Sequence, residues 1–176
     1  MKQFNNNKAF TLTELLVVTG IILVLSAIIL PNYRVGERSF ALQRSAHKLA
    51  QDLRGTEEMA MSAKKFNCPT GILNGYMVYA WINWTDYYRF ALCDSSSVLD
   101  KIIPFEKGVK IKEIAFYRNG IWELNKVYFW VSFKPPDPTI EMIANSEKIK
   151  ITLSLIKDQT KTKTVIVEKS GLIYVE

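Results

Sequence analysis

The feature that most constrains this chain is an apolar run of 21 residues close to its N-terminus, Phe10–Leu30. The run reads FTLTELLVVTGIILVLSAIIL, and Glu14 is its one charged residue. A helix of about 20 apolar residues crosses the hydrocarbon core of a bilayer. We therefore predict a transmembrane helix over residues 10–30. The run is longer than the apolar region of a cleaved secretory signal, so we expect it to be retained.

The charges around this run predict its orientation. Residues 1–9 contain Lys2 and Lys8 and no acid, which places this end in the cytoplasm and the remainder of the chain outside it. A plain single-pass anchor carrying a β domain is one interpretation. Glu14 fits that interpretation poorly, because an acid costs roughly 2.5–3.5 kcal/mol near a bilayer centre and less near the interface. Glu14 is therefore a candidate functional residue.

The residues around Glu14 carry a resemblance to a known family. Residues 8–18, KAFTLTELLVV, resemble the prepilin N-terminal processing motif of type IV pilins and type II secretion pseudopilins. That motif has a short basic leader, a small residue, Phe, and an acid at the fifth residue counted from the Phe. The family usually has Gly before the cleaved bond, where this chain has Ala9, which is also small.

The resemblance implies a processing pathway and an assembled state. A membrane prepilin peptidase would cut between Ala9 and Phe10, release residues 1–9 as a leader, and methylate the new amino group of Phe10. Glu14 would then face the positive N-terminus of a neighbouring subunit inside a filament. An acid and an ammonium paired in an apolar filament core offset each other's desolvation, so the pair would fix subunit register rather than add much stability.

Residues 31–66 are predicted to continue the helix. Pro31 lies where many members of the family have a helix-bending proline, and its missing N–H is expected to kink the helix. Beyond it, apolar residues recur at steps of 4, 3, 4 and 7, which is the pattern of an amphipathic helix. They are Leu42, Ala46, Leu49, Leu53 and Ala60. We expect this stripe to pack against a folded head.

Polar residues occupy the other sides of the same predicted helix. His47 lies off the apolar stripe and is interpreted as a solvated histidine. The basic residues are interpreted mainly as a solvated face, with contacts to lipid head groups or other subunits as the alternative. They are Arg34, Arg38, Arg44, Lys48 and Arg54.

Residues 67–176 are predicted to form a β-rich head. Short runs rich in aromatic and β-branched residues alternate with turn signals such as Asn119-Gly120. The expected strands are 76–83, 87–93, 109–117, 127–133, 148–156, 164–167 and 172–175, with seven to nine in all. Ser95-Ser96-Ser97 is interpreted as a loop, and no second helix is expected. The predicted fold class is α+β, a long N-terminal helix packed on an antiparallel β-sheet head.

Within the prepilin superfamily, the chain most resembles the GspH/FimT group of minor pseudopilins. The segments that carry this resemblance are Ala46–Arg54 (AHKLAQDLR), Gly108-Val109 and Ser170–Ile173. The resemblance implies a head of two sheets and a subunit of a type IV pilus-like or type II secretion filament. It implies as partners other pilin or pseudopilin subunits, the prepilin peptidase and an inner-membrane assembly platform. The subunit would start in the bacterial inner membrane and end in a periplasmic or extracellular filament.

The two cysteines of the chain are Cys68 and Cys93, both in the part expected outside the cytoplasm. An oxidising compartment favours disulfides, so one bridge between them is predicted. It would tie the end of the helix to the second strand of the first hairpin. Two buried free thiols are the alternative.

No catalytic constellation is found in the sequence. With one His and two Cys, a zinc site is not expected, and no glycine-rich phosphate-binding motif occurs. We therefore expect no enzyme activity, no metal and no cofactor. Binding of DNA for uptake is an alternative function, because some GspH/FimT-like relatives serve DNA uptake. Its candidate phosphate contacts are Lys157, Lys161, Lys163 and Lys169, for which a solvated hairpin is the default interpretation.

Overall fold

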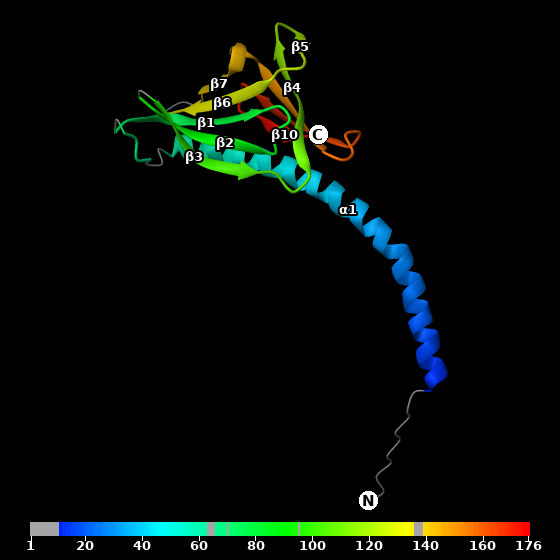
Figure 1. Ribbon diagram of the computed structural model, residues 1–176. Coiled ribbons are helices and arrows are strands. Elements are labelled where there is room, and N and C mark those ends of the chain that lie inside the picture. The colour runs from blue at the N-terminus through cyan, green and yellow to red at the C-terminus, as the bar shows by residue number, and fades with distance from the viewer. Residues whose placement is uncertain (1–10, 63–65, 70, 95, 136–138) are drawn as a thin grey trace, which may run out of the picture. The chain divides into compact units, whose positions relative to one another are not determined.

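The computed structural model describes residues 11–62, 66–69, 71–94, 96–135 and 139–176, without the side chains of residues 30–35 and Thr139. The chain forms two compact units that divide between Glu37 and Arg38. One long helix, α1 (Leu12–Met61), contributes to both units (Figure 1). The second half of α1, from Arg38, belongs to the compact head. The predicted division of the chain at residues 30/31 and 66/67 remains a prediction.

The first unit consists of the apolar half of α1. An 18-residue window, Leu12–Ile29, has a mean hydropathy of 2.5, and none of it is buried. By length and composition, this helix is able to cross a membrane. Helix α1 continues through Pro31 without a break. The bend expected at Pro31 remains a prediction.

The second unit contains two antiparallel five-stranded sheets. The first sheet has the strand order β3-β2-β1-β6-β7. Its strands are β1 (Leu73–Trp81), β2 (Asp86–Cys93), β3 (Ser96–Pro104), β6 (Tyr128–Lys134) and β7 (Thr139–Met142). The second sheet has the order β10-β9-β8-β4-β5. Its strands are β4 (Val109–Arg118), β5 (Ile121–Glu123), β8 (Lys148–Leu155), β9 (Thr162–Glu168) and β10 (Ile173–Val175). A short 3₁₀ turn, η1 (Ile143–Asn145), follows β7.

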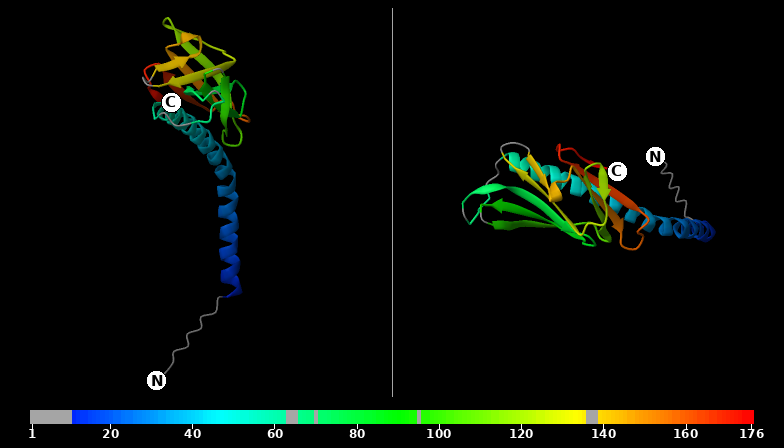
Figure 2. Two further views of the ribbon diagram at one scale, coloured as in Figure 1. Left: turned by 90° about the vertical axis from the view of Figure 1, so that its left-hand side faces the viewer. Right: turned by 90° about the horizontal axis from the view of Figure 1, so that it is seen from above.

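The core of the head lies where both sheets meet the second half of α1. Leu42, Ala46, Leu49, Leu53 and Ala60 are all buried, as their helical spacing predicts. They share one hydrophobic cluster with inward-facing residues of both sheets, including Val78 and Ile149. Figure 2 shows this half of α1, in cyan, running alongside the strands of both sheets. The helix is therefore part of the head and not only its support.

Local sequence explains two features of the sheets. Asn119 and Gly120 both have positive φ values, +52° and +81°, which confirms the predicted tight turn between β4 and β5. Gly75, at an irregularity in β1, has a φ of +149°, and a Cβ there would lie 2.2 Å from the carbonyl oxygen of Phe133. Only glycine allows β1 and β6 to approach so closely at this point.

The α+β fold class is confirmed, and two details differ from expectation. The described residues form ten strands rather than seven to nine. The chief omission is β3, whose first residue, Ser96, falls in the segment interpreted as a loop. This strand has no strict alternation, because a bulge at the β2–β3 pairing shifts its register and much of it is exposed. Helix α1 ends at Met61, before the predicted limit at residue 66.

Candidate functional site at the start of helix α1

Helix α1 begins with a reciprocal pair of hydrogen bonds between Thr11 and Glu14. The backbone N–H of Glu14 donates to Thr11 Oγ1 over 3.2 Å, and the backbone N–H of Thr11 donates to Glu14 Oε2 over 3.1 Å. The Thr11 hydroxyl also donates to Glu14 Oε2 over 2.9 Å. This arrangement is a capping box, with Thr11 as the N-cap residue and Glu14 at the third helical position. It fixes the first residue of the helix at Leu12.

The capping box leaves the charge of Glu14 without a cationic partner. Within the described part of the chain, no lysine or arginine forms an ion pair with this carboxylate. Its neighbours along the helix are Leu12, Leu15 and Leu16, which are 79%, 62% and 65% exposed. An exposed acid in the first turn of an exposed apolar helix requires a partner charge once that helix enters an apolar environment.

Sequence reasoning identified Glu14 but not its local partner. The pattern Thr-x-x-Glu before an apolar run is itself a signal for a capping box, so Thr11 was open to prediction. Ala9 and Phe10, the predicted cleavage site and methylated residue, lie outside the described residues, as does the leader of residues 1–9. Their roles remain predictions.

A comparison with protein families gives a match at the N-terminal end of the chain. A family model described as the prokaryotic N-terminal methylation motif matches residues 4–30. The chain therefore carries this methylation motif at its N-terminus. The matched range covers residues 4–9 of the predicted leader, Glu14 and the whole candidate membrane span, so the motif and the exposed apolar half of α1 coincide. This coincidence supports membrane anchoring of the chain through α1.

Two solved structures of the type IV minor pilin FimU from Pseudomonas aeruginosa, in different crystal forms, are similar to this chain. Both are 11% identical in sequence and cover 77% of this chain. They match over 87% and 92% of their own lengths, with TM-scores of 0.46 and 0.45. No curated protein matches the chain.

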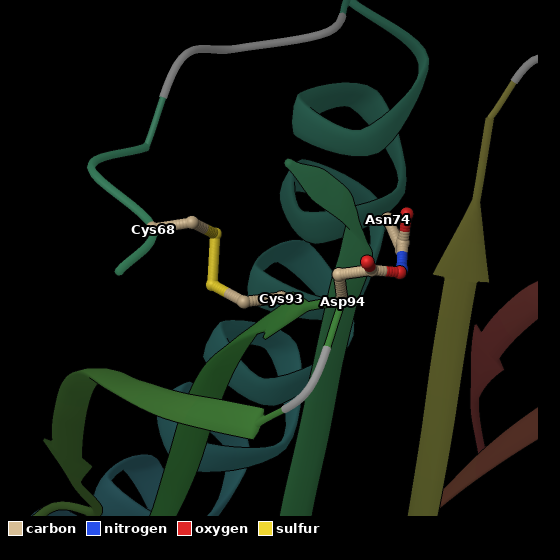
Figure 3. The surroundings of a disulfide bond; sticks show 4 residues. All are labelled: Cys68, Asn74, Cys93 and Asp94. Atoms are coloured by element: carbon tan, nitrogen blue, oxygen red, sulfur yellow. A yellow bond between two sulfur atoms is a disulfide. The ribbon is translucent and has the colours of Figure 1, made fainter. Parts of the chain in front are cut away.

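The predicted cysteine pair lies at one end of the head. Cys68 and Cys93 are joined by a disulfide, with 5.7 Å between their Cα atoms (Figure 3). The bridge connects the segment after α1 to the last residue of β2. Beside it, the side-chain amide of Asn74 donates to the carboxylate of Asp94 over 3.5 Å.

The four lysines proposed as DNA contacts do not lie at one site. Lys157 and Lys161 lie in the turn between β8 and β9, and Lys163 is the second residue of β9. Lys169 follows the other end of β9, where its ammonium donates to the side chain of Asn145 over 3.0 Å. A strand of seven residues is roughly 20 Å long, so Lys169 is separated from the other three.

Three further candidate residues on the head are exposed or contact neighbouring loops. His47 is exposed on α1, off the buried stripe. Arg44 forms a loose ion pair with Glu106 at 3.6 Å, and Lys48 donates to the carbonyl of Pro104 over 3.0 Å. No group of three metal-ligating side chains occurs among the described residues.

One buried polar contact was not anticipated from the sequence. The Tyr87 hydroxyl, on β2, donates a hydrogen bond to the Asp52 carboxylate on α1, and Tyr87 is fully buried. Burial, and then the hydrogen bond to Asp52, raise the pKa of Tyr87 above its ordinary value. This bond joins the helix to the first sheet. It depends on tertiary packing, since 35 residues separate the two partners.

Proposed function

We propose that this chain is a minor pilin or pseudopilin, a structural subunit of a type IV pilus-like or type II secretion filament. The observation that carries the proposal is the agreement between the motif at residues 4–30 and an exposed apolar helix that begins with Glu14 in its first turn. An apolar helix with no cover of its own needs lipid before assembly and neighbouring helices after it. The partners implied are other pilin subunits, the prepilin peptidase and a membrane assembly platform.

The chemistry of maturation follows from the same residues. Cleavage between Ala9 and Phe10 would create a new α-amino group on Phe10, close in sequence to Glu14. In a bundle of such helices, the carboxylate of Glu14 would pair with the amino group of a neighbouring Phe10. Such a pair is costly to break inside an apolar filament core, because one charge would be left unpartnered.

The test is the intact mass of the chain extracted from membranes of cells with an active prepilin peptidase. We expect a mature chain that begins at Phe10 and carries a methyl group. Ala9→Leu, which places a bulky side chain beside the bond, should block cleavage, and Gln3→Leu, earlier in the leader, should not. A wild-type chain that still begins at Met1 in these cells would reject the proposal.

The same samples test the disulfide. Alkylation of the unreduced, denatured chain should leave Cys68 and Cys93 unmodified if the bridge forms outside the cytoplasm. Alkylation of both thiols in the native extract would favour the alternative of two free cysteines.

A further inference from the structure

The turn between β1 and β2 contains the sequence Asn83-Trp84-Thr85. Asn-x-Ser/Thr, where x is not proline, is the acceptor sequence for Asn-linked glycosylation. The sequence contains this pattern once, because no other asparagine is followed two residues later by serine or threonine. A glycan is bulky and polar, so its acceptor has to lie on the surface. The position of Asn83 in the fold therefore decides whether the pattern is usable.

The side chain of Asn83 is exposed in this turn. Its backbone has a φ of +66°, in the left-handed region that asparagine tolerates better than most residues. The ammonium of Lys110 donates to Asn83 Oδ1 over 3.0 Å. Among the described residues, no acceptor binds the side-chain Nδ2, which is the atom that takes the sugar. The reacting nitrogen of the acceptor therefore remains open to solvent.

The side chain of Thr85 is open in the same way. Thr85 is exposed, and its backbone carbonyl accepts a hydrogen bond from the N–H of Phe105 over 2.9 Å. Its hydroxyl has no hydrogen-bond partner within the described part of the chain. The hydroxyl two residues after the asparagine is the second group that the acceptor sequence requires. Both groups that define the sequence are thus accessible in the folded head.

Backbone hydrogen bonds hold the shape of the turn. The N–H of Asn83 donates to the carbonyl of Ile111 on β4 over 2.8 Å, and the N–H of Ile111 donates to the carbonyl of Trp84 over 3.0 Å. Neither bond uses the amide of Asn83 or the hydroxyl of Thr85. A sugar on Nδ2 therefore leaves the bonds between this turn and β4 in place.

Aromatic rings lie next to the acceptor asparagine. Trp81 and Trp84 flank Asn83, with 4.7 Å between their ring centroids, and Trp84 lies 5.1 Å from Tyr88. Trp81 is 37% exposed. The C–H groups on one side of a sugar ring pack favourably on the electron-rich face of an aromatic ring. The first sugar on Asn83 would therefore have a partly exposed indole within reach.

The compartment of the head is suited to this modification. The disulfide between Cys68 and Cys93 is a bond of oxidising compartments outside the cytoplasm. Oligosaccharides preassembled on a lipid carrier are transferred to asparagine on that side of the membrane. The apolar half of α1 is able to keep the chain at the same membrane.

We propose that Asn83 is an Asn-linked glycosylation site, modified by a membrane oligosaccharyltransferase that uses a polyprenyl-diphosphate-linked oligosaccharide. A bond forms between Asn83 Nδ2 and the anomeric carbon of the first sugar, and the bond from that carbon to the diphosphate oxygen breaks. Polyprenyl diphosphate leaves, and a base takes the proton that Nδ2 loses. The reaction needs a head outside the cytoplasm, and to that extent the site rests on the proposed function.

The experiment is mass spectrometry of the full chain extracted from membranes of its own cells. We expect the tryptic peptide of residues 66–89 to be heavier by whole sugar residues, with the added mass on Asn83 after fragmentation. Asn83→Asp, which tolerates the same φ but lacks Nδ2, should lose this mass completely. Thr85→Val, which keeps the shape of threonine without its hydroxyl, should also lose it, and Thr85→Ser should retain it.

Asn145 provides a matched control. It is exposed, has a φ of +52°, and its Oδ1 accepts from the ammonium of Lys169 over 3.0 Å. It is followed by Ser146-Glu147 and so lacks the hydroxyl at the second position. We expect no sugar on Asn145 and no change of the glycan in Asn145→Asp. Sugar on Asn145, sugar on Asn83 in Thr85→Val, or sugar that persists in Asn83→Asp would overturn the proposal.

The N-terminus and the cysteines of the same samples separate this proposal from the proposed function. An unmodified Asn83 in a chain that begins at Phe10 and has bridged cysteines would overturn the glycosylation site and leave the filament subunit in place. A glycosylated Asn83 in a chain that still begins at Met1 would do the reverse. A chain that has neither change would overturn both.

Discussion

At the scale of single residues, Glu14 has two separable roles. Its carboxylate accepts hydrogen bonds from Thr11 in a capping box, and its charge has no cation to meet within the described chain. The capping role needs only an acceptor, which glutamine also supplies, whereas the role in subunit pairing needs the negative charge. Substitutions at Thr11 and Glu14 can therefore distinguish the two roles.

We predict that Glu14→Gln keeps the capping box and membrane insertion but sharply lowers incorporation into filaments. Thr11→Ala should have the opposite effect. It removes the cap, at a cost of about 1 kcal/mol to the helix start, and leaves the charge and most of the incorporation in place. Incorporation is measured by quantifying the chain in sheared filaments relative to the membrane fraction. Equal incorporation of Glu14→Gln and wild type would exclude a role for the charge.

Tyr87 and Asp52 show how one buried residue pair joins two elements. We predict that Tyr87→Phe lowers the free energy of unfolding by roughly 1–2 kcal/mol, because the partly exposed Asp52 loses its donor while water replaces part of that bond. Urea unfolding of the full chain in detergent measures this change. Tyr88→Phe, a neighbouring substitution on the outer side of the sheet, serves as the control and should change stability little.

The same tyrosine predicts a pH dependence. Burial and the bond to Asp52 raise the folded-state pKa of Tyr87 above 10.0. The unfolded chain ionises this hydroxyl near its ordinary pKa of about 10, so stability that is present below that pH is lost as the pH rises above it. Between about pH 9 and about pH 11, wild-type stability should fall more steeply than that of Tyr87→Phe. Parallel curves would show that Tyr87 titrates normally in the folded chain.

At the scale of elements, α1 has two halves with different surroundings. The first half is apolar and has no cover from the chain, while the second half buries one stripe against both sheets. The exposed side of this second half carries polar residues. Its burial therefore depends on the helical spacing of its apolar residues rather than on overall hydrophobicity. Burial of the stripe that contains Leu49 and Leu53 is therefore what stabilises the packing of the helix on the sheets.

We predict that Leu49→Ala or Leu53→Ala lowers the free energy of unfolding of the head by about 2–5 kcal/mol, since both side chains are fully buried and truncation leaves a cavity. Gln51→Ala, on the exposed side of the same helix, should change it by less than about 0.5 kcal/mol. Chemical unfolding followed by tryptophan fluorescence measures all three. A Leu49→Ala variant with unchanged stability would show that the helix does not pack on the sheets.

At the scale of the whole molecule, the chain divides into a membrane-compatible unit and a compact head. The head contains the second half of α1, both sheets, the core and the disulfide. The division at Glu37 and Arg38 lies inside the helix, and no loop separates the two units. The head therefore carries the part of α1 that it needs for its own core.

We predict that a truncated chain that starts at Val35 is monomeric at low concentration, folds and stays in solution without detergent. The full chain should need detergent, because nothing in the described structure covers Leu12–Ile29. Circular dichroism and size-exclusion chromatography measure both properties. An unfolded truncated chain would show that the head requires the first half of α1.

The sequence by itself determined the apolar span, the position of Glu14, the buried stripe of α1 and the α+β class. Each depends on local periodicity or on a short motif, and these act within one element. Tertiary structure decided the pairing of strands into two sheets, the inclusion of β3, the bond between Tyr87 and Asp52, and the separation of Lys169 from the other candidate lysines. These features join residues that are far apart in the chain, and strand order and register depend on which faces the core buries. The outward-facing aromatic residues Tyr79, Tyr88 and Trp130 belong to this second group, because alternation marks the residues of each strand and only strand order brings β1, β2 and β6 side by side.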